Sequence, residues 1–281
     1  MPRATNQFPP QSMKRCFAAI RHSALTLYLL GASDYKTIFL PITVFACVAA
    51  PLQCNVSNQF QSVEEDAINR PWRALPSGMI GARHMYIMRW ALPPLCIALS
   101  VMYGRDVVLT SIALTVTTVV YDGCSLAGHW IGKNACNISG YVTFEIGATK
   151  IMGAQSALDA TALSAIFCSA IIIFTTIQSQ DFADVAGDAS IGRVTFPIYA
   201  PEASRLVTLV ALVLWSVFLA ALWDLGTLSG SLFVALGAYV GWRYYNLRSV
   251  KDDEMSYRMY NLWLFFVHLL PAQSRWSILG C

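Results

Sequence analysis

Charged side chains are scarce in this 281-residue chain: they make up 12% of it, while 56% of its residues are hydrophobic. An average soluble domain carries roughly 25% charged and about 45–50% apolar residues. Half the usual charge leaves too little polar surface to coat a water-soluble globule of this size. The scarcity also excludes disorder, because disordered chains are rich in charge and poor in aromatic residues. The composition therefore predicts a polytopic membrane protein rather than a soluble α/β enzyme.

The chain also lacks a strong net charge and an ordered cysteine pattern. A net charge of +3 gives no reason to expect a nucleic-acid partner. The eight cysteines form neither a CxxC nor a CxxxH pattern, so neither a zinc site nor a disulfide framework is predicted. Nothing in the sequence predicts a protein partner; the expected partner is the lipid bilayer.

Hydrophobic runs predict an all-α helical bundle. Residues 1–34 are basic and amphipathic without the apolar core of a signal peptide, so we expect a cytosolic segment on the membrane surface. The bundle then occupies residues 35–281. Several runs are shorter than the ~20 residues that span a bilayer, but they can extend into polar flanks that partner helices cover. The eight candidate spans are Ile38–Leu52, Tyr86–Tyr103, Val107–Tyr121, Tyr141–Met152, Ala157–Ile177, Leu206–Leu225, Ser231–Tyr245 and Tyr260–Leu270.

The distribution of basic residues predicts the topology, because lysine and arginine in short loops stay cytosolic. A crossing at every run leaves Arg105, Lys150 and Arg275 on one side. The opposite, cytosolic side receives Arg70, Arg73, Arg83, Lys133, Arg193, Arg248 and Lys251.

The basic N-terminus falls on the wrong side of this scheme. One more helix between Leu52 and Asn58 would correct it, but Gln53–Ser57 is too short to hold one. Either the N-terminus lies outside or the chain lacks one helix, and we favour the second interpretation.

The few acidic residues are concentrated in two segments on the predicted cytosolic side. Six of the 16 are Glu64, Glu65, Asp66, Asp181, Asp184 and Asp188. The last three have the spacing i, i+3, i+7, which predicts one helix with all three carboxylates on one face. Such a stack repels itself unless a cation lies within it, and Mg²⁺ prefers oxygen ligands of this kind together with phosphate oxygens.

A second stripe on a helix would combine Asn58, Ser62 and Glu65, with Asp66 beside it. Arginine and proline follow both acidic segments, and arginine binds phosphate in a bidentate manner. Two such segments favour a functional site over a solvated helix end at the membrane surface.

The acidic segments and their flanks resemble the two motifs of the UbiA superfamily of intramembrane prenyltransferases. Residues 66–78 (Asp66-Ala-Ile-Asn69-Arg70-Pro71-Trp72-Arg73-Ala-Leu-Pro76-Ser-Gly78) resemble the segment after the first motif. Asp181-x-x-Asp184-x-x-Gly187-Asp188 with Gly192-Arg193-x-Thr195-x-Pro197 resembles the second. The first motif departs from the family, because Gln59 and Ser62 replace two acids and only Asn58 and Asp66 match.

The resemblance implies a bundle of nine helices around a cavity open to lipid, with Mg²⁺ as cofactor and a polyprenyl diphosphate as substrate. It implies catalytic roles for Asp66, Asp181, Asp184 and Asp188. The same four residues, with Asn58 and Glu65, would ligate the metal. Diphosphate would be bound by Arg70, Arg73, Arg193 and Lys133, although Lys133 lies in the polar stretch Asp122–Asn137 and is equally compatible with a plain cytosolic loop.

The altered first motif and residues 69–73 look most like the fungal branch that contains membrane-bound terpene cyclases. We therefore expect ionisation of a farnesyl-type diphosphate followed by cyclisation, in an integral protein of the endoplasmic reticulum whose active site faces the cytosol. The alternatives are prenyl transfer to an aromatic or other small acceptor, a catalytically impaired relative that lacks one helix, and an unrelated cation transporter. His22, His84 and His268 have no partner pattern and are expected to be structural or interfacial.

Overall fold

The computed structural model describes residues 50–123, 126–152 and 157–276, and within them it contains helices and no strand. The long helices are α5 (Ala82–Ser100), α6 (Arg105–Gly123), α7 (Trp130–Met152), α8 (Ala160–Thr176), α11 (Pro201–Leu222), α12 (Thr227–Asn246) and α13 (Val250–Leu269). The shorter α-helices are α3 (Ala50–Gln61), α4 (Val63–Asn69), α9 (Val185–Ser190), α10 (Phe196–Tyr199) and α14 (Pro271–Trp276). Single 3₁₀ turns are η3 (Val101–Tyr103), η4 (Leu126–Gly128) and η5 (Ile177–Gln180).

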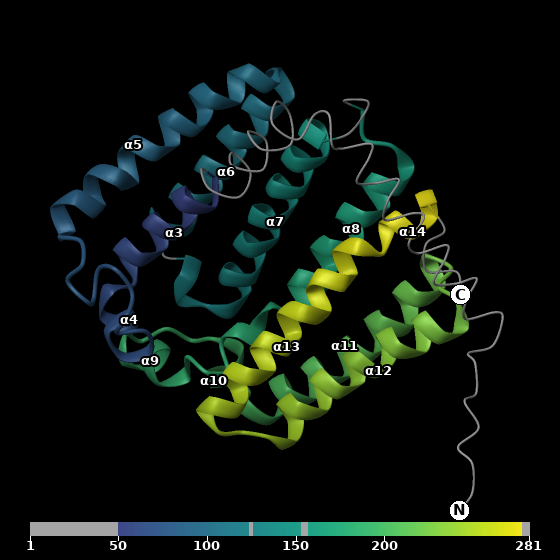
Figure 1. The fold of residues 1–281 in the computed structure, drawn as a ribbon. Coiled ribbons are helices and arrows are strands. Elements are labelled where there is room, and N and C mark those ends of the chain that lie inside the picture. Colours follow the sequence, from purple (N-terminus) through teal and green to yellow (C-terminus); the bar gives the residue numbers. More distant parts are fainter. Residues whose placement is uncertain (1–49, 124–125, 153–156, 277–281) are drawn as a thin grey trace, which may run out of the picture.

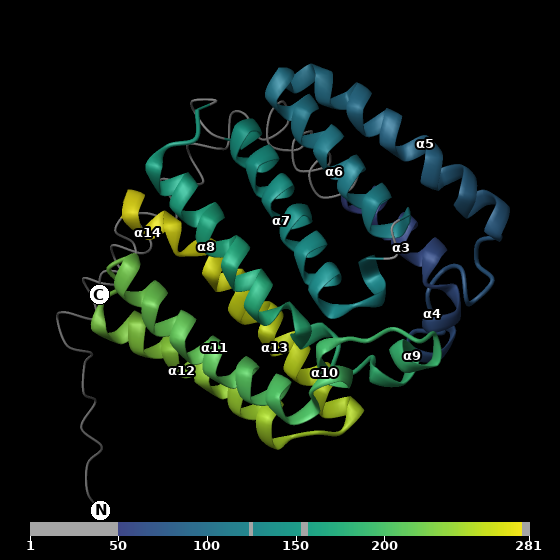
Figure 2. The ribbon, with the colours of Figure 1, turned by 180° about the vertical axis from the view of Figure 1, so that it is seen from behind.

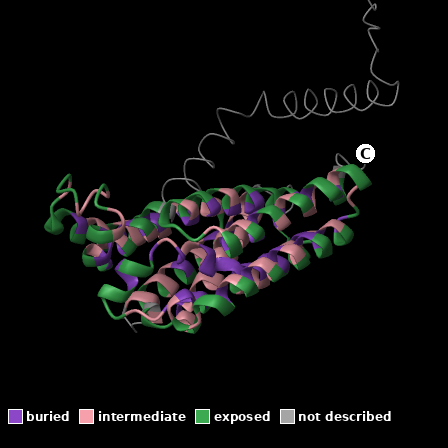
Figure 3. Cartoon of the chain, turned by 90° about the horizontal axis from the view of Figure 1, so that it is seen from below, coloured by how far each residue is buried: buried purple, intermediate pink, exposed green. Residues whose placement is uncertain are grey.

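Successive long helices pack against one another in an up-and-down bundle, from α5 through α8 and from α11 through α13 (Figures 1 and 2). Ala82–Tyr103, Ala160–Gln180 and Pro201–Leu222 are long and apolar enough to cross a membrane. Large apolar side chains such as Phe167 and Leu214 face outward, and in Figure 3 exposed residues lie along the outer sides of the helices. An apolar exterior around a helical core confirms the predicted all-α polytopic membrane bundle.

Seven of the eight predicted runs correspond to the long helices, but two helices begin far earlier than predicted. The apolar residues from Tyr141 belong to α7, which already begins at Trp130, and those from Tyr260 belong to α13, which begins at Val250. Lys133 is therefore in a helix, and of the two alternatives left open for it, the plain cytosolic loop residue is wrong. Polar residues are admitted at the start of α7 because Lys133 and Asn134 are buried and Lys133 lines a cavity, so neither faces lipid.

The first predicted run and the N-terminal segment 1–34 lie almost wholly outside the described residues. The described part begins with α3, which carries Gln53–Ser57, so this segment is helical and not a connection between helices. The sequence also predicts that one helix is absent upstream of Asn58, and this stays a prediction.

Among the described helices, α11 and α12 share the most extensive contact, and two glycines of α12 face α11. A Cβ atom at Gly237 would lie 2.0 Å from Oγ of Ser216, and one at Gly241 would lie 2.8 Å from Cδ1 of Leu209. Small residues one turn apart let two membrane helices approach backbone to backbone. Trp263 of α13 donates a hydrogen bond from Nε1 to Oγ of Ser216 (2.9 Å), which ties the third helix to this pair.

Helices α4, α9 and α10 lie together at one end of the bundle (Figure 1), at the end where α7 begins. A short pairing between His129 and Val194 joins the loop before α7 to the loop before α10. Trp130 stacks on Phe196 with ring centroids 5.0 Å apart. These contacts bring the start of α7 to the two acidic segments.

Candidate active site

The two acidic segments meet at this end of the bundle through the contact between α4 and α9. The first segment is helical on both sides of Ser62, because Ser62 N–H donates to the Asn58 carbonyl and Asp66 N–H donates to the Ser62 carbonyl. The second segment is not the single helix that the spacing predicts. It runs from η5 through a tight turn at Asp181–Asp184 into α9, and Asp184 N–H donates to the carbonyl of Asp181, three residues back (3.2 Å). The three aspartates still converge.

Asn69 joins the two segments and was not recognised as a site residue from the sequence. Its Nδ2 donates to the Asp184 carbonyl and its Oδ1 accepts from Gly187 N–H, both at 3.1 Å. A Cβ atom at Gly187 would lie 2.2 Å from Nδ2 of Asn69. The glycine of the second segment is therefore required for close approach to the first.

Each of the five acids that the sequence predicted for the site is paired with a basic side chain. Arg73 Nη1 donates to both carboxylate oxygens of Asp66 at 2.7 and 2.8 Å, and Arg70 pairs with Asp184. Lys133 Nζ lies 2.5 Å from Oδ1 of Asp181.

Arg193 bridges the two segments with one nitrogen. Its Nη1 donates to Glu65 at 2.6 Å and to Asp188 at 2.9 Å. The structure thus brings together every acid and base that the sequence predicted for the site.

The predicted site residues differ in their access to a cavity of about 850 Å³ that opens beside them. Asp66 and Asp188 are 0% and 1% exposed and lie behind the wall, where they hold arginines. The cavity is lined by the others, namely Asn58, Glu65, Arg70, Arg73, Lys133, Asp181, Asp184 and Arg193.

Burial dominates the electrostatics of the acids that face the cavity. Desolvation raises the pKa of Glu65, Asp181 and Asp184 above the ordinary carboxyl value, and the adjacent basic side chain opposes the shift in each case. A second cation near these carboxylates would favour their charged form further.

The donor set fits a hard divalent cation. Within the described residues, no group of three or more acidic, histidine or cysteine side chains is placed so that it could hold a metal ion. However, the donors at the cavity are the carboxylate oxygens of Glu65, Asp181 and Asp184, which are oxygen ligands of the kind that such a cation prefers. Five carboxylates also face only four cationic side chains in this cluster, so a bound diphosphate would require added positive charge. Mg²⁺ has the required charge and preference for oxygen ligands.

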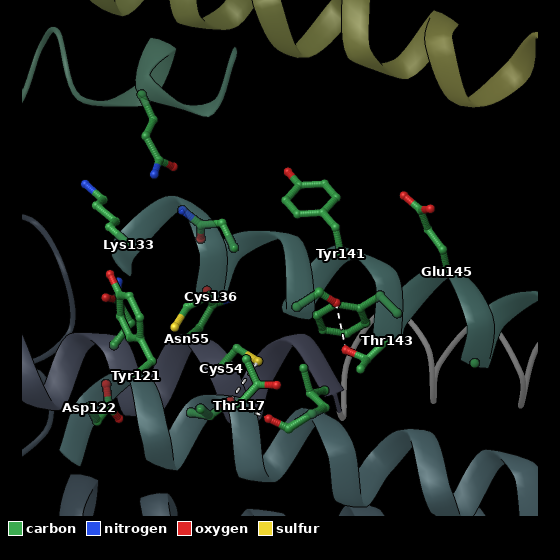
Figure 4. Close-up of a pocket in the computed structure, with 18 of the residues that line it drawn as sticks. Cys54, Asn55, Thr117, Tyr121, Asp122, Lys133, Cys136, Tyr141, Thr143 and Glu145 are labelled. Atoms are coloured by element: carbon green, nitrogen blue, oxygen red, sulfur yellow. Dashed lines mark hydrogen bonds between the residues drawn. The ribbon is translucent and has the colours of Figure 1, made fainter. Parts of the chain in front are cut away.

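Beyond the ion-pair cluster, the cavity continues between α6, α7 and α13. Figure 4 shows Lys133, Tyr141 and Glu145 pointing from α7 to the same side, with Tyr121 and Thr117 on α6 facing α7. The aromatic lining residues are Tyr121, Tyr141, Phe144 and Tyr257.

Three lining residues, Asp122, Glu145 and His268, carry polar contacts that the sequence did not reveal. Asp122 accepts a hydrogen bond from Arg89 (3.0 Å) and another from Ser57, and Glu145 pairs with His268, which the sequence predicted to be structural or interfacial. The partners in these contacts are distant in the chain, so no local sequence pattern predicts the contacts.

The chain matches the model of the UbiA prenyltransferase family over residues 22–269. It is 28% identical over 276 residues to the fumagillin beta-trans-bergamotene synthase of Aspergillus fumigatus. That similarity covers 89% of this chain and 92% of the synthase. It is 26% identical over 289 residues to a polyprenyl transferase of Hericium erinaceus, covering 91% and 96% of the two chains.

Among solved structures, a UbiA homologue from Archaeoglobus fulgidus bound to GPP and Mg²⁺ has the same fold, with a TM-score of 0.56 and 13% identity. The similarity covers 82% of this chain and 87% of that one. Together with the match over 22–269, these similarities confirm the resemblance drawn from the acidic segments: the chain belongs to the UbiA prenyltransferase family.

Proposed function

We propose that this protein ionises a farnesyl-type diphosphate in the presence of Mg²⁺ and cyclises the resulting allylic cation inside the membrane. The observation that carries the proposal is the joining of two environments in one cavity. Four basic side chains gather at one end of it, and its continuation is lined by aromatic and hydroxyl side chains. The similarity to a fungal bergamotene synthase over nearly the whole length of both chains supports cyclisation over other fates.

The basic residues would bind the diphosphate and stabilise it as it leaves. Arg70, Arg193 and Lys133 line the cavity from three different elements, and Arg73 lies beside them. Preorganised cations aimed at a leaving group stabilise the charge that develops on it, which is worth roughly 10²–10³ in rate for one donor.

Glu65, Asp181 and Asp184, with Asn58 beside them, are the residues that would hold Mg²⁺, which supplies positive charge to the departing diphosphate. Asp66 and Asp188 would act from behind by holding Arg73 and Arg193 in position. This division refines the predicted ligand set, in which all six residues contact the metal.

The aromatic walls would protect the cation. Tyr121, Tyr141, Phe144 and Tyr257 present ring faces or edges to the cavity, and a ring face attracts a nearby cation through its quadrupole. The apolar and aromatic lining would limit the water beside the cation, so that its own double bonds react before water captures it.

Prenyl transfer to an aromatic or other small acceptor is the second candidate function. The similarity to a polyprenyl transferase over 96% of that protein favours it. The predicted orientation, with the ion-pair cluster toward the cytosol of an endoplasmic-reticulum membrane, suits either reaction because both use a water-soluble diphosphate. A catalytically impaired relative lacking one helix would show weak or no diphosphate release.

Microsomes that contain the protein, incubated with radiolabelled farnesyl diphosphate and Mg²⁺ with and without a phenolic acceptor, distinguish these functions. We expect cyclic hydrocarbon in both samples and no labelled acceptor. A labelled phenol would establish transfer, and the absence of diphosphate release from folded protein would reject both.

Two substitutions test the assignment of the acids. Asp184→Ala should abolish diphosphate release from protein that is still expressed and inserted in the membrane. Glu65→Gln should weaken the dependence on Mg²⁺ more than Glu64→Gln, because Glu65 is buried at the cavity and Glu64 is exposed. Equal effects of the two glutamate changes would contradict the role of Glu65.

A further inference from the structure

A second polar cluster lies in the same cavity, away from the ion pairs. Glu145 on α7 and His268 on α13 both line the cavity, with Nε2 of His268 3.0 Å from Oε1 of Glu145. Ser169 on α8 donates a hydrogen bond to the same carboxylate oxygen. Glu145 lies twelve residues after Lys133 on α7, which is about 18 Å along the helix axis. Three helices thus converge on one carboxylate that is too distant to touch a diphosphate held by Lys133.

The geometry requires one proton between the two side chains. Nδ1 of His268 lies 2.7 Å from the Leu264 carbonyl oxygen, which only accepts, so Nδ1 carries a hydrogen. Nε2 then faces a carboxyl oxygen at 3.0 Å, and two acceptors would repel at that distance. Either the imidazole or the carboxyl group is protonated, and in both cases the pair is neutral overall. A neutral pair is tolerated inside a membrane bundle, where an isolated charge is not.

The second oxygen of Glu145 remains available to the cavity. Within the described residues, Oε1 receives both hydrogen bonds, from His268 and from Ser169, and Oε2 accepts none. The Glu145 side chain is 17% exposed. A carboxylate held by one oxygen and open at the other is suited to accept a proton from a bound molecule.

We propose that Glu145 accepts the proton whose loss ends the reaction, and that His268 and Ser169 are positioning residues for its carboxylate. The proposal rests on the proposed ionisation of a prenyl diphosphate. Both fates of the cation, cyclisation and capture by an aromatic ring, need the loss of one proton before a stable product forms. The acids of the ion-pair cluster lie at the diphosphate end of the cavity, where they would hold Mg²⁺ and the basic side chains, whereas Glu145 lines the part of the cavity away from that end.

The step balances as a deprotonation. A C–H bond next to the cationic carbon breaks, its electron pair becomes the second bond of the new alkene, and the proton moves to Oε2 of Glu145. The step starts from the form of the pair in which His268 is the imidazolium and Glu145 is the carboxylate. Afterwards Glu145 is a neutral acid, and the imidazolium of His268 carries the positive charge that the substrate cation has lost. When the product leaves, the acid returns its proton to water and the pair regains its starting state.

Replacing Glu145 with glutamine tests the step, because the amide keeps the size of the side chain and removes its basicity. The readouts are diphosphate release and the product mixture from farnesyl diphosphate and Mg²⁺, measured on the purified full chain in nanodiscs. We expect release to stay within about threefold, while the ratio of the principal alkene to alcohols and other alkenes falls at least tenfold. Glu64→Gln makes the same chemical change at an exposed residue outside the cavity, so it is the matched control and should change this ratio by less than twofold.

An unchanged product ratio in Glu145→Gln would overturn the proposal. So would a parallel loss of diphosphate release and product in folded protein, because a proton acceptor acts after ionisation. If the glutamine variant does not fold, Glu145→Asp decides: withdrawing the carboxylate by one methylene should shift the ratio, and an unchanged ratio overturns the proposal. Failure of the unmodified protein to release diphosphate would instead reject the proposed function, so the two failures are distinguishable.

Discussion

Replacing Gly187 with alanine tests how the two acidic segments are held together. A Cβ atom at residue 187 would lie 2.2 Å from Nδ2 of Asn69 and 2.5 Å from its Cγ. Atoms do not approach this closely, so the Asn69 side chain has to move. It then loses both of its hydrogen bonds, the one to the Asp184 carbonyl and the one from residue 187.

The expected effect follows from these two contacts. A hydrogen bond contributes about 0.5–1.5 kcal/mol net, so losing two destabilises the protein by about 1–3 kcal/mol. Alanine is favoured over glycine in a helix by up to about 1 kcal/mol, which acts in the opposite direction. We expect a net destabilisation of about 1–2 kcal/mol, or a fall of roughly 2–8 °C in melting temperature. Diphosphate release should fall at least tenfold, because Asp184 and its partner Arg70 move with the turn.

Melting in detergent and diphosphate release provide the assays, and Gly230→Ala is the matched control. Gly230 is also buried in a helix, but a Cβ atom there makes ordinary contacts of 3.6 Å or more, so no loss is expected. In an Asn69→Ala background, Gly187→Ala should add little, because the colliding side chain is gone. Additive losses, or a Gly187→Ala variant with normal stability and activity, would refute the reasoning.

Two further substitutions test packing and pairing by melting in detergent. Gly237→Ala should destabilise the protein by about 1–3 kcal/mol, since the new Cβ would meet Ser216 Oγ at 2.0 Å and the Leu212 carbonyl at 3.0 Å; a loss no larger than that of Gly230→Ala would show that α11 and α12 have room to separate. Lys133→Met should destabilise it by about 3–5 kcal/mol, because the buried Asp181 loses its partner. Lys150→Met is the control and should leave the melting temperature almost unchanged, since its partner Asp106 is exposed and an exposed ion pair contributes little. Equal effects of the two lysine changes would contradict the burial of the Lys133 pair.

Hydrophobic runs predicted the existence of the long helices better than their ends. Where a helix faces lipid along its length, as α11 does, the run and the helix nearly coincide. The run at Tyr141 missed the first eleven residues of α7, because Lys133 and Asn134 there are buried against other helices and give no apolar signal. A scan for apolar residues detects contact with lipid and cannot detect a polar residue that a neighbouring helix covers.

The residues of the site were predictable, but their pairing was not. Scarce acids next to arginines identified both segments, because a charge near a membrane needs a reason to be there. That Arg193 bridges Glu65 and Asp188 depends on the meeting of α4 with α9, which the spacing of neither segment specifies. Glu145 and His268 are 123 residues apart, so only the fold, which brings the end of α13 to α7 across the cavity, reveals them.

The pairing of acids with bases at the cavity has a consequence for binding. Asp181, Asp184 and Glu65 each hold a basic side chain. Mg²⁺ alone has to displace a base from its carboxylate, and diphosphate alone has to displace a carboxylate from its base. Either event leaves a buried charge unpaired, which is strongly unfavourable. When both are bound, Mg²⁺ binds the carboxylates and the diphosphate binds the basic side chains, so every buried charge has a partner of opposite sign.

We therefore expect Mg²⁺ and inorganic diphosphate to stabilise the protein together by more than the sum of their separate effects. A coupling free energy of about 1–3 kcal/mol corresponds to a 5- to 150-fold tightening of diphosphate binding by the metal. Melting temperatures in EDTA, with Mg²⁺ alone, with diphosphate alone and with both measure this coupling. The Glu65→Gln variant, which loses one carboxylate but keeps Arg193, should reduce it, while Glu64→Gln should not. If Mg²⁺ alone stabilises the protein as much as both together, the metal binds the carboxylates without having to displace their basic partners. The ion pairs then do not weaken the binding of Mg²⁺ alone, and the reasoning is wrong.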